Sequence, residues 1–296
     1  MLLLNDSDAM LNLGIHNKEL KNYEEMKKYY LMAIKLGNST AMKNLGIYYE
    51  EIKIYEEMEK YYIMAIELGN SSAMNCLGHY YINIENNYEE MKKYYLMSIE
   101  LGNSSAMNCL GLYFFEIKNY EEMKKYYLMA IKLNESCAMF NLGYYYKIIE
   151  NNYEEMKKYY LMATELGNDT AMIDLGNYYY KIKNYEEMKK YYLMAIELNK
   201  SCAMYNLGYY YKNTEKNYEE MEKYYLMATE LGNSSAMVDL GDYYELIEKF
   251  EIILEEIECP ILLEKVEKCY EIRSCGHKFS NGILKCEKCP LCRCNI

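Results

Sequence analysis

The sequence predicts an all-α superhelical solenoid of about eight helix-turn-helix repeats, followed by a small cysteine-rich module. Three observations support this. A short motif recurs along the first 250 residues, each copy holds two stretches with helical spacing of apolar side chains, and the composition changes near residue 259. We therefore divide the chain into a solenoid over 1–249, a capping segment and linker over 250–258, and a compact module over 259–296.

The recurring motif reads Tyr-Glu-Glu-Met and continues into Tyr-Tyr-Leu-Met-Ala. Its leading aromatic residue stands at Tyr23, Tyr55, Tyr88, Tyr120, Tyr153, Tyr185, Tyr218 and Phe250, at spacings that alternate between 32 and 33 residues. The extra residue falls between the two helices of a repeat, as in Glu85-Asn86-Asn87. A loop accepts such an insertion without disturbing helix packing, so the alternation predicts a turn there.

The first helix of each repeat follows a Gly-Asn-Ser-Ser sequence such as 69–72. Glycine is typical of a residue that ends a helix, and serine of one that caps the next. Beyond this turn, Met74, Leu77 and Tyr81 have the spacing of one helical face. We therefore expect Gly69 to end one helix, Ser72 to cap the following one, and these three side chains to be buried.

The second helix of each repeat carries an apolar stripe and paired charges. In the first copy the stripe consists of Tyr23, Met26, Tyr30, Ala33 and Ile34. Glu24 and Lys28 have the favourable i,i+4 orientation for an ion pair. One helical pair cannot bury such a stripe, so neighbouring repeats must stack to form a continuous core.

The two ends of the solenoid differ from the interior copies, as capping repeats do. At the start, 8–17 predicts a shortened first helix. At the end, 250–258 predicts a truncated second helix, with Phe250, Ile253, Leu254 and Ile257 on one face.

The motif resembles tetratricopeptide and Sel-1-like repeats over about residues 6–250. Leu45-Gly46 and Tyr49 match the first-helix Leu-Gly and Tyr of that family, and Tyr62 with Ala65 matches its second-helix positions. The usual first-helix Trp is Met here, and Asn70 stands where the family has its inter-repeat Pro. The resemblance implies a protein-binding array.

Variation among the copies is concentrated two residues before and two residues after each Leu-Gly leucine. In the resembling family these positions line the concave groove. The resemblance therefore implies an aromatic-lined peptide groove formed by Phe140, Tyr144, Ile173, Tyr205 and Tyr209. Such a groove suits a target protein that offers an apolar or extended peptide. The alternative is that relaxed positions drift without function.

Charge and hydropathy limit the classes of partner that we expect this chain to bind. The net charge is −12; the last 38 residues have seven basic against four acidic residues, so they carry +3 and the remainder −15. An acidic solenoid argues against nucleic acid as a ligand. No apolar run approaches the ~20 residues needed to span a membrane, and Met1–Leu4 is too short for a signal peptide. We expect an intracellular, cytoplasmic protein with no membrane partner.

Cysteine and histidine fall into two groups. His16 and His79 stand alone and are expected to be ordinary surface residues. The solenoid cysteines occupy small-residue positions of first helices and are expected to be buried; they are Cys76, Cys109, Cys137 and Cys202. The other seven cysteines lie in the last 38 residues, where an intracellular location favours metal ligation over disulfides.

The C-terminal module contains a ligand set for one structural zinc. A segment of 38 residues cannot bury a sufficient core, so a metal staple is expected. Cys275, His277, Cys289 and Cys292 supply the Cys₃His donors of a tetrahedral site. The alternative is a disordered cysteine-rich tail.

The order of these ligands resembles a RING finger, in which two zinc sites interleave. The site formed by the second and fourth ligand pairs is complete. The other keeps Cys259, and three non-ligands, Leu262, Ser280 and Ile283, stand at its remaining positions. This suggests a one-zinc module whose second half is held by apolar packing, as in U-box relatives. Two zinc ions would require a rebuilt site from Cys259, Cys269, Cys286 and Cys294.

The RING resemblance implies docking of a ubiquitin-conjugating enzyme. Ile261 and Pro290 match its hydrophobic contacts, and Arg293 matches the residue that clamps ubiquitin, whereas Glu287 stands near the position of a usual aromatic. RING modules supply no catalytic residue of their own. The leading hypothesis is therefore a ubiquitin ligase-type adaptor, and the alternative is a non-catalytic scaffold with a structural zinc module. A cysteine enzyme is disfavoured because no base stands beside a tail thiol.

Overall fold

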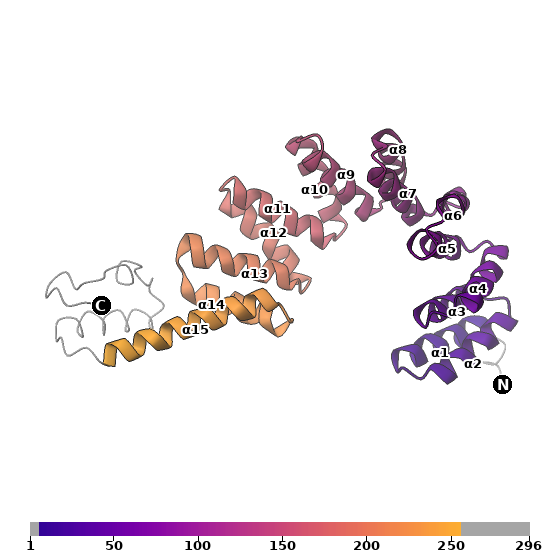
Figure 1. The fold of residues 1–296 in the computed structure, drawn as a ribbon, viewed down its shortest axis with the longest axis horizontal. Helices are drawn as coiled ribbons and strands as arrows, with labels where there is room; N and C mark the ends of the chain where they lie inside the picture. The colour runs from indigo at the N-terminus through magenta and orange to yellow at the C-terminus, as the bar shows by residue number, and fades with distance from the viewer. Residues whose placement is uncertain (1–5, 256–296) are drawn as a thin grey trace. The chain divides into compact units, whose positions relative to one another are not determined.

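The computed structural model describes residues 6–255, with side chains placed through residue 247, and all secondary structure in this range is helical. The chain divides into two compact units, residues 1–159 and 160–296, which are treated separately (Figure 1). The predicted all-α repeat solenoid is confirmed for this range. No helix between residues 6 and 255 is long and apolar enough to cross a bilayer.

First and second helices alternate along the described chain. The first helices of the repeats are α1 (Ser7–Glu19), α3 (Ser39–Glu51), α5 (Ser71–Asn83), α7 (Ser104–Glu116), α9 (Ser136–Ile148), α11 (Asp169–Lys181), α13 (Ser201–Tyr210, continued by the π-helix η2, Tyr211–Glu215) and α15 (Ser234–Glu255). The second helices are α2 (Tyr23–Lys35), α4 (Tyr55–Glu67), α6 (Tyr88–Glu100), α8 (Tyr120–Ile131), α10 (Tyr153–Glu165), α12 (Tyr185–Glu197) and α14 (Tyr218–Glu230).

The turn between repeats uses a glycine and an asparagine. Gly69 has φ +74°, as expected for a residue that ends a helix. The capping residue is Asn70 rather than the expected Ser72, because Asn70 Oδ1 accepts a hydrogen bond from the Ala73 amide at 3.0 Å. Asn70 Nδ2 also donates to Ser39 Oγ of the preceding repeat at 3.2 Å. Ser39 thus links two repeats through Asn70, and Asn70 also caps the helix.

The stripe on each second helix is narrower than predicted. Met26, Tyr30 and Ala33 are buried, whereas Tyr23 is 41% exposed and Ile34 is half-buried. Tyr23 is the first residue of α2, and its ring lies 5.5 Å from the ring of Tyr48. The leading tyrosine therefore contacts the next repeat at the helix start and does not enter the core.

The Leu-Gly pair of each first helix receives a tyrosine ring. A Cβ atom on Gly46 would lie 2.6 Å from Tyr62 Cδ1, so only glycine lets α3 and α4 approach this closely. Among the predicted face residues, Met74 and Leu77 are buried as expected. Tyr81 is only half-buried, and its neighbour Tyr80 is buried instead. The Tyr81 ring stacks on Tyr94 at 5.6 Å.

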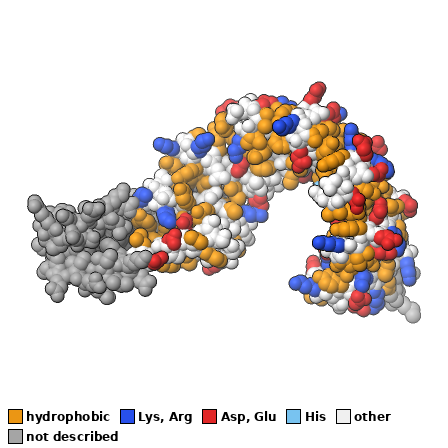
Figure 2. Space-filling view, in the orientation of Figure 1, with side chains coloured by type: hydrophobic (Ala, Val, Ile, Leu, Met, Phe, Trp, Pro, Cys, Tyr) orange, Lys and Arg blue, Asp and Glu red, His pale blue; other side chains and the backbone are white. Residues whose placement is uncertain are grey.

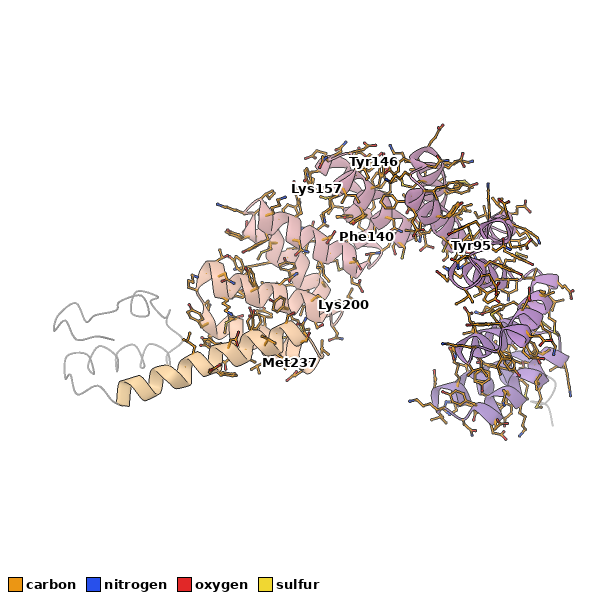
Figure 3. All side chains as sticks on the ribbon, in the orientation of Figure 1. Tyr95, Phe140, Tyr146, Lys157, Lys200 and Met237 are labelled. Atoms are coloured by element: carbon orange, nitrogen blue, oxygen red, sulfur yellow. The ribbon has the colours of Figure 1, made fainter. Side chains whose placement is uncertain are left out.

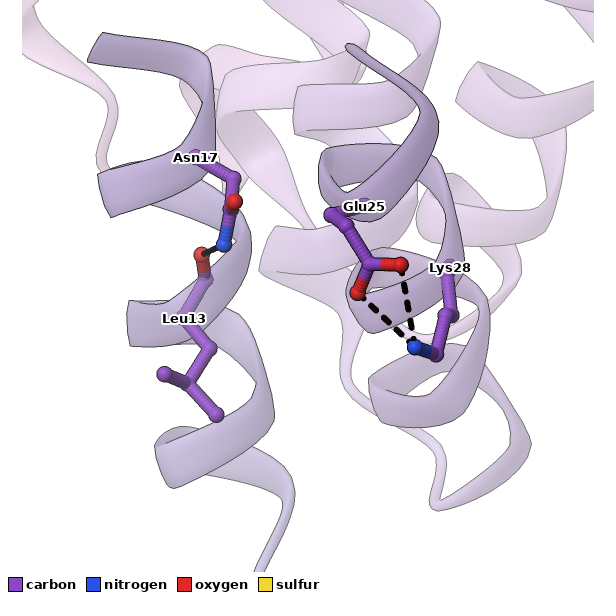
Figure 4. A network of polar contacts seen from close by, with 4 residues as sticks. All are labelled: Leu13, Asn17, Glu25 and Lys28. Carbon is purple, nitrogen blue, oxygen red and sulfur yellow. Dashed lines mark hydrogen bonds and ion pairs between the residues drawn. The ribbon is translucent and has the colours of Figure 1, made fainter. Parts of the chain in front are cut away.

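Exposed ion pairs join residues three apart, not four. Lys28 Nζ lies 2.8 Å from Glu25 Oε2 (Figure 4), and Lys27 Nζ lies 2.7 Å from Glu24 Oε1. The expected i,i+4 pair of Glu24 and Lys28 is therefore replaced by two i,i+3 pairs. The motif places two acids directly before Met and two lysines after it, so each lysine meets a nearer acid.

The alternating spacing is confirmed by the intra-repeat turns. Between α3 and α4 the turn has three residues, and between α5 and α6 it has four. The longer turn places Asn86 at φ +52° and lets Glu85 accept a hydrogen bond from the Tyr80 hydroxyl at 2.7 Å. The inserted residue thus forms a second type of turn without lengthening either helix.

The last described helix corrects the predicted cap. α15 runs without interruption through the position of Phe250, so 250–255 extend a first helix and do not start a second one. Interior turns place Lys or Asn in the left-handed conformation, as at Lys53. The equivalent position here is Glu248, a strong helix former that favours continuation of α15.

Candidate functional site: slots between successive first helices

In each unit, two pairs of consecutive first helices are separated by a slot, and a buried tyrosine of the intervening second helix forms its floor. We call this feature the inter-helix slot. Its walls come from residues near the Leu-Gly leucine of each first helix, which are the positions where the copies differ. Among the described residues, at least two slots are open, one in each unit, and at least two others are filled by side chains of the chain itself.

The open slot of the first unit lies between α7 and α9, above Tyr127 of α8. It has a volume of about 180 Å³ and is lined by Leu112, Phe115, Tyr127, Phe140, Asn141 and Tyr144. The Tyr144 ring lies 6.3 Å from Phe140, which Figure 3 labels, and 6.4 Å from Phe115. We call this slot the apolar pocket, since aromatic and aliphatic groups dominate its walls.

The polar groups of the apolar pocket are few. Asn141 Nδ2 donates to Asn108 Oδ1 at 2.9 Å, so its amide is tied to the previous repeat. The Tyr127 hydroxyl has no hydrogen-bond partner among residues 6–255. Burial first, and then the charges of Cys109 and Glu116, raise the pKa of Tyr127. The pocket therefore offers an apolar interior with an exposed carboxylate, Glu116, close by.

The open slot of the second unit lies between α11 and α13, above Tyr192 of α12. It has a volume of about 190 Å³ and is lined by Asn177, Tyr180, Tyr192, Asn206 and Tyr209. Asn177 Oδ1 accepts hydrogen bonds from the Tyr192 hydroxyl at 2.7 Å and from Asn206 Nδ2 at 3.1 Å. We call this slot the amide pocket. Asn177 Nδ2 and Asn206 Oδ1 take no part in these two bonds and can serve a ligand as donor and acceptor.

A histidine and a cysteine fill the slot between α5 and α7. His79 Nε2 lies 3.3 Å from Cys109 Sγ, and the imidazole meets the Tyr95 ring edge-on at 5.7 Å. His79 is an exposed residue, as expected, but it is not isolated, because its ring contacts Cys109 and Tyr95. Burial lowers the pKa of His79 and raises the pKa of Cys109 to about 11. The pair is thus neutral, unlike the thiolate of a nucleophilic cysteine.

Three of the five predicted groove residues line a pocket. Phe140 and Tyr144 line the apolar pocket, and Tyr209 lines the amide pocket. Tyr205 instead stacks on Tyr225 at 5.5 Å and fills the slot between α13 and α15. Ile173 packs against the core around Met172 and Met188. Peptide binding by these residues stays a prediction.

A third series of slot residues was not predicted from the sequence. It consists of the residue directly before each Leu-Gly leucine. In this position Asp174 accepts from the Tyr160 hydroxyl at 3.0 Å, and Asp239 accepts from Tyr225 at 2.9 Å. The signal was present in the composition of the series, because every member is a small residue able to form hydrogen bonds: Asn12, Asn44, Cys76, Cys109, Asn141, Asp174, Asn206 and Asp239.

The remaining solenoid predictions have mixed outcomes. His16 is exposed and lies 3.9 Å from Glu19, as expected of a surface residue. Cys76 and Cys109 are half-buried. Cys137 and Cys202 are exposed, contrary to expectation, because each is the second residue of its helix, where other repeats have an exposed serine.

The predicted zinc and conjugating-enzyme residues lie outside the described residues. They are Cys259, Ile261, Cys269, Cys275, His277, Cys286, Cys289, Pro290, Cys292, Arg293 and Cys294. Within residues 6–255, no group of three or more Cys, His, Asp and Glu side chains is arranged to hold a metal ion.

The family comparison matches two segments of the chain, residues 105–137 and 169–202, to the tetratricopeptide repeat. Each segment contains the first wall and the floor tyrosine of one open pocket. The fold is that of a tetratricopeptide- or Sel1-like helical repeat protein. No curated protein matches the sequence significantly.

Solved structures share this repeat fold at low sequence identity. A Sel1 repeat protein from Oxalobacter formigenes is 20% identical (TM-score 0.59), with 75% of this chain and 99% of that chain covered. The protective antigen c5321 of uropathogenic Escherichia coli is 22% identical (TM-score 0.52) and covers 93% of this chain, which spans 66% of that protein. Yeast Tom70 is 17% identical (TM-score 0.54), with 91% of this chain and 64% of Tom70 covered.

Proposed function

We propose that the chain is a protein-interaction scaffold that binds an extended peptide segment of a target protein through its inter-helix slots. The observation that carries this proposal is the apolar pocket, whose aromatic walls remain open while the slot between α5 and α7 is filled. Concave, largely apolar pockets with a few polar groups are the usual form of a recognition site. A repeat scaffold also presents its variable positions in a row, which suits an extended ligand.

The chemistry of the pocket specifies the ligand side chain. A space of about 180 Å³ lined by Leu112, Phe115 and Phe140 suits one large aliphatic or aromatic side chain. A basic residue beside that side chain is favoured by Glu116 and by the net charge of −12. Hydrophobic and charged side chains are interspersed on the face drawn in Figure 2, with no continuous basic track.

The amide pocket is assigned a different ligand group. Asn177 and Asn206 line this pocket, and the bonds between the two side chains leave one amide donor and one carbonyl acceptor unused. This pair matches the hydrogen-bonding pattern of a peptide group or of an Asn or Gln side chain. The amide pocket therefore suits a polar segment of a target, whereas the apolar pocket suits an apolar anchor.

The test selects 12-residue peptides from a random display library on the full chain. Enriched peptides are expected to share one large apolar residue with Lys or Arg beside it. Phe140→Ala should weaken the binding of a selected peptide by about 2 kcal/mol, which raises Kd roughly thirtyfold, as truncation of a central anchor does. Fluorescence anisotropy measures this.

Val238→Ala is the matched control. Val238 occupies the same register as Phe140 but lines neither described pocket, so its truncation should leave Kd unchanged. Equal losses in both variants, or none in Phe140→Ala, would reject the apolar pocket as the binding site.

A second candidate function, a ubiquitin ligase-type adaptor, is favoured by the C-terminal sequence. Cys275, His277, Cys289 and Cys292 provide the donor set of a structural zinc. Ile261, Pro290 and Arg293 match the docking residues of the resembling RING modules. A solenoid-bound target beside a docked conjugating enzyme would present its lysines at high effective concentration.

The adaptor hypothesis is tested by metal content and ubiquitin transfer. Native mass spectrometry should find one zinc per chain, lost in Cys289→Ser, and Ile261→Ala should abolish ubiquitin chain formation while peptide binding persists. A content of two zinc ions per chain would indicate that the rebuilt second site also binds zinc. A chain without zinc and without transfer activity would leave the scaffold function alone.

A further inference from the structure

The two open pockets are equivalent positions of a longer repeat. The alternating spacings of 32 and 33 residues make a period of 65 residues, as between Tyr23 and Tyr88. Five residues of the apolar pocket have counterparts 65 residues later that line the amide pocket, among them the floor tyrosines Tyr127 and Tyr192. The same step backwards from the apolar pocket leads to α3, α4 and α5, where Tyr62 is buried over Gly46.

This third position, which we call the acidic site, has a carboxylate where the two open pockets have an aromatic ring. Glu50 of α3 stands in the place of Phe115 and Tyr180. Its Oε2 accepts a hydrogen bond from the Tyr62 hydroxyl at 2.6 Å. Burial first, and then Cys76 of α5 and Glu50, raise the pKa of Tyr62. The carboxylate therefore lies at the floor tyrosine, between the two first helices.

Glu50 is half-buried and has no cation partner among the described residues. The Tyr62 hydroxyl is the one described group that donates to it, whereas its neighbour Glu51 pairs with Lys18 at 2.8 Å. A partly dehydrated carboxylate without a cation gains from a cationic ligand. Lys43, the one basic residue of α3, stands seven residues earlier, or about 10 Å along the helix. At that distance its repulsion is less than half of the attraction at contact, because the Coulomb energy falls with distance.

The α5 wall of the acidic site is polar as well. Asn75 takes the register of Phe140, and its Oδ1 is buried without a hydrogen-bond donor among the described residues. His79 takes the register of Tyr144, but its ring lies in the neighbouring slot against Cys109 and Tyr95. The aromatic walls of the apolar pocket are thus replaced by a carboxylate and an amide that accept hydrogen bonds. Lys and Arg side chains carry donors and no acceptor, so they complement this site.

We propose that the acidic site binds a Lys or Arg side chain of the same extended peptide whose apolar residue occupies the apolar pocket. This inference rests on the proposed scaffold function and adds a second basic residue to the target, distinct from the one beside the anchor. Both sites lie in the first unit, and α3 and α7 are two first helices apart. Neighbouring helices lie about 10 Å apart, so the sites are separated by about 20 Å. An extended peptide advances about 3.4 Å per residue, which places the basic residue about six positions from the anchor.

A double-mutant cycle on the full chain tests the pairing. A library-selected peptide is synthesised as a series in which one Lys, or Gln as its neutral counterpart, moves along both sides of the apolar anchor. Fluorescence anisotropy should give the lowest Kd with Lys about six positions away on one side. Glu50→Gln removes the charge but keeps an acceptor for the Tyr62 hydroxyl. It should raise the Kd of that Lys peptide roughly tenfold, as loss of a charged hydrogen bond does, and leave the Kd of the Gln peptide unchanged.

Glu67→Gln is the matched control, because it removes the same charge at an exposed position at the end of α4 and should change neither Kd. Binding that responds to Phe140→Ala but shows no coupling between Glu50 and any Lys position would overturn the acidic site and leave the proposed function standing. Equal losses in Glu50→Gln and Glu67→Gln would replace the acidic site by a general attraction to an acidic chain. Peptides that respond to neither Phe140→Ala nor Glu50→Gln would overturn both proposals.

Discussion

The apolar pocket and the amide pocket share one frame and differ at three positions. The conserved frame consists of the floor tyrosine, a wall tyrosine and a wall asparagine: Tyr127, Tyr144 and Asn141 in the first unit, and Tyr192, Tyr209 and Asn206 in the second. The differences are Leu112 against Asn177, Phe115 against Tyr180, and Phe140 against Tyr205. Pocket geometry is thus set by the repeat, and pocket chemistry by a few variable residues.

Phe140 and Tyr205 occupy the same register, differ by one hydroxyl group and contact different side chains. Tyr205 stacks on Tyr225 and lies in the slot between α13 and α15. Phe140 has no hydroxyl and lines its own pocket beside Tyr144. Register alone therefore does not decide which slot a side chain enters.

Removing the floor tyrosines should give the largest effect, and the two units should differ only by the roughly 1 kcal/mol of the Tyr192 hydrogen bond. Tyr127 and Tyr192 are almost fully buried over Gly111 and Gly176. Tyr127→Ala and Tyr192→Ala should each lower the free energy of unfolding by about 3–5 kcal/mol, as loss of a buried aromatic does. Urea denaturation followed by circular dichroism measures this. Markedly unequal losses would show that the two pockets do not share a structural frame.

The next prediction compares an open slot with the filled slot between α5 and α7, and it concerns the alkylation rate of Cys109. Because burial raises the pKa of this thiol to about 11, its thiolate fraction at pH 8 should be on the order of a hundredfold below that of an ordinary cysteine. The rate with iodoacetamide should then rise about tenfold per pH unit up to pH 11. Exposed Cys202 is the reference. Equal rates for the two cysteines at pH 8 in the native chain would contradict the raised pKa of Cys109.

Deleting one hydroxyl should give a smaller effect that distinguishes the pockets. Tyr192→Phe removes the 2.7 Å hydrogen bond to Asn177 and should cost about 1 kcal/mol. Tyr127→Phe removes a hydroxyl without a described partner and should cost close to nothing. The same denaturation experiment compares them. A reversed order would mean that the hydrogen bonding of the two floors has been misassigned.

The repeat architecture was predictable because the copies serve as an internal alignment. The period, the turn insertion and the Leu-Gly core follow from positions that stay constant, and the variable positions indicated Phe140, Tyr144 and Tyr209 as pocket residues. Constancy reports packing against a neighbouring helix, which every interior repeat must make.

Choices between adjacent similar residues were not predictable. Asparagine and serine are both good helix caps, and only the hydrogen bond from Ala73 identifies Asn70. Tyr80 and Tyr81 both fit a helical stripe, and the crossing of neighbouring helices decides which one is buried. The continuation of α15 past Phe250 depends on which residues stand in the turn, a signal weaker than the periodic motif.

The most direct test exchanges the differing pocket residues and measures the Kd of a library-selected apolar peptide. The variant Leu112→Asn with Phe115→Tyr gives the first unit the chemistry of the second, and Asn177→Leu with Tyr180→Phe makes the reverse exchange. The first should weaken binding at least about tenfold, as loss of apolar contacts at an anchor does, and the second should not weaken it. Unchanged binding by the first variant, or an equal loss in both, would contradict recognition through the apolar pocket.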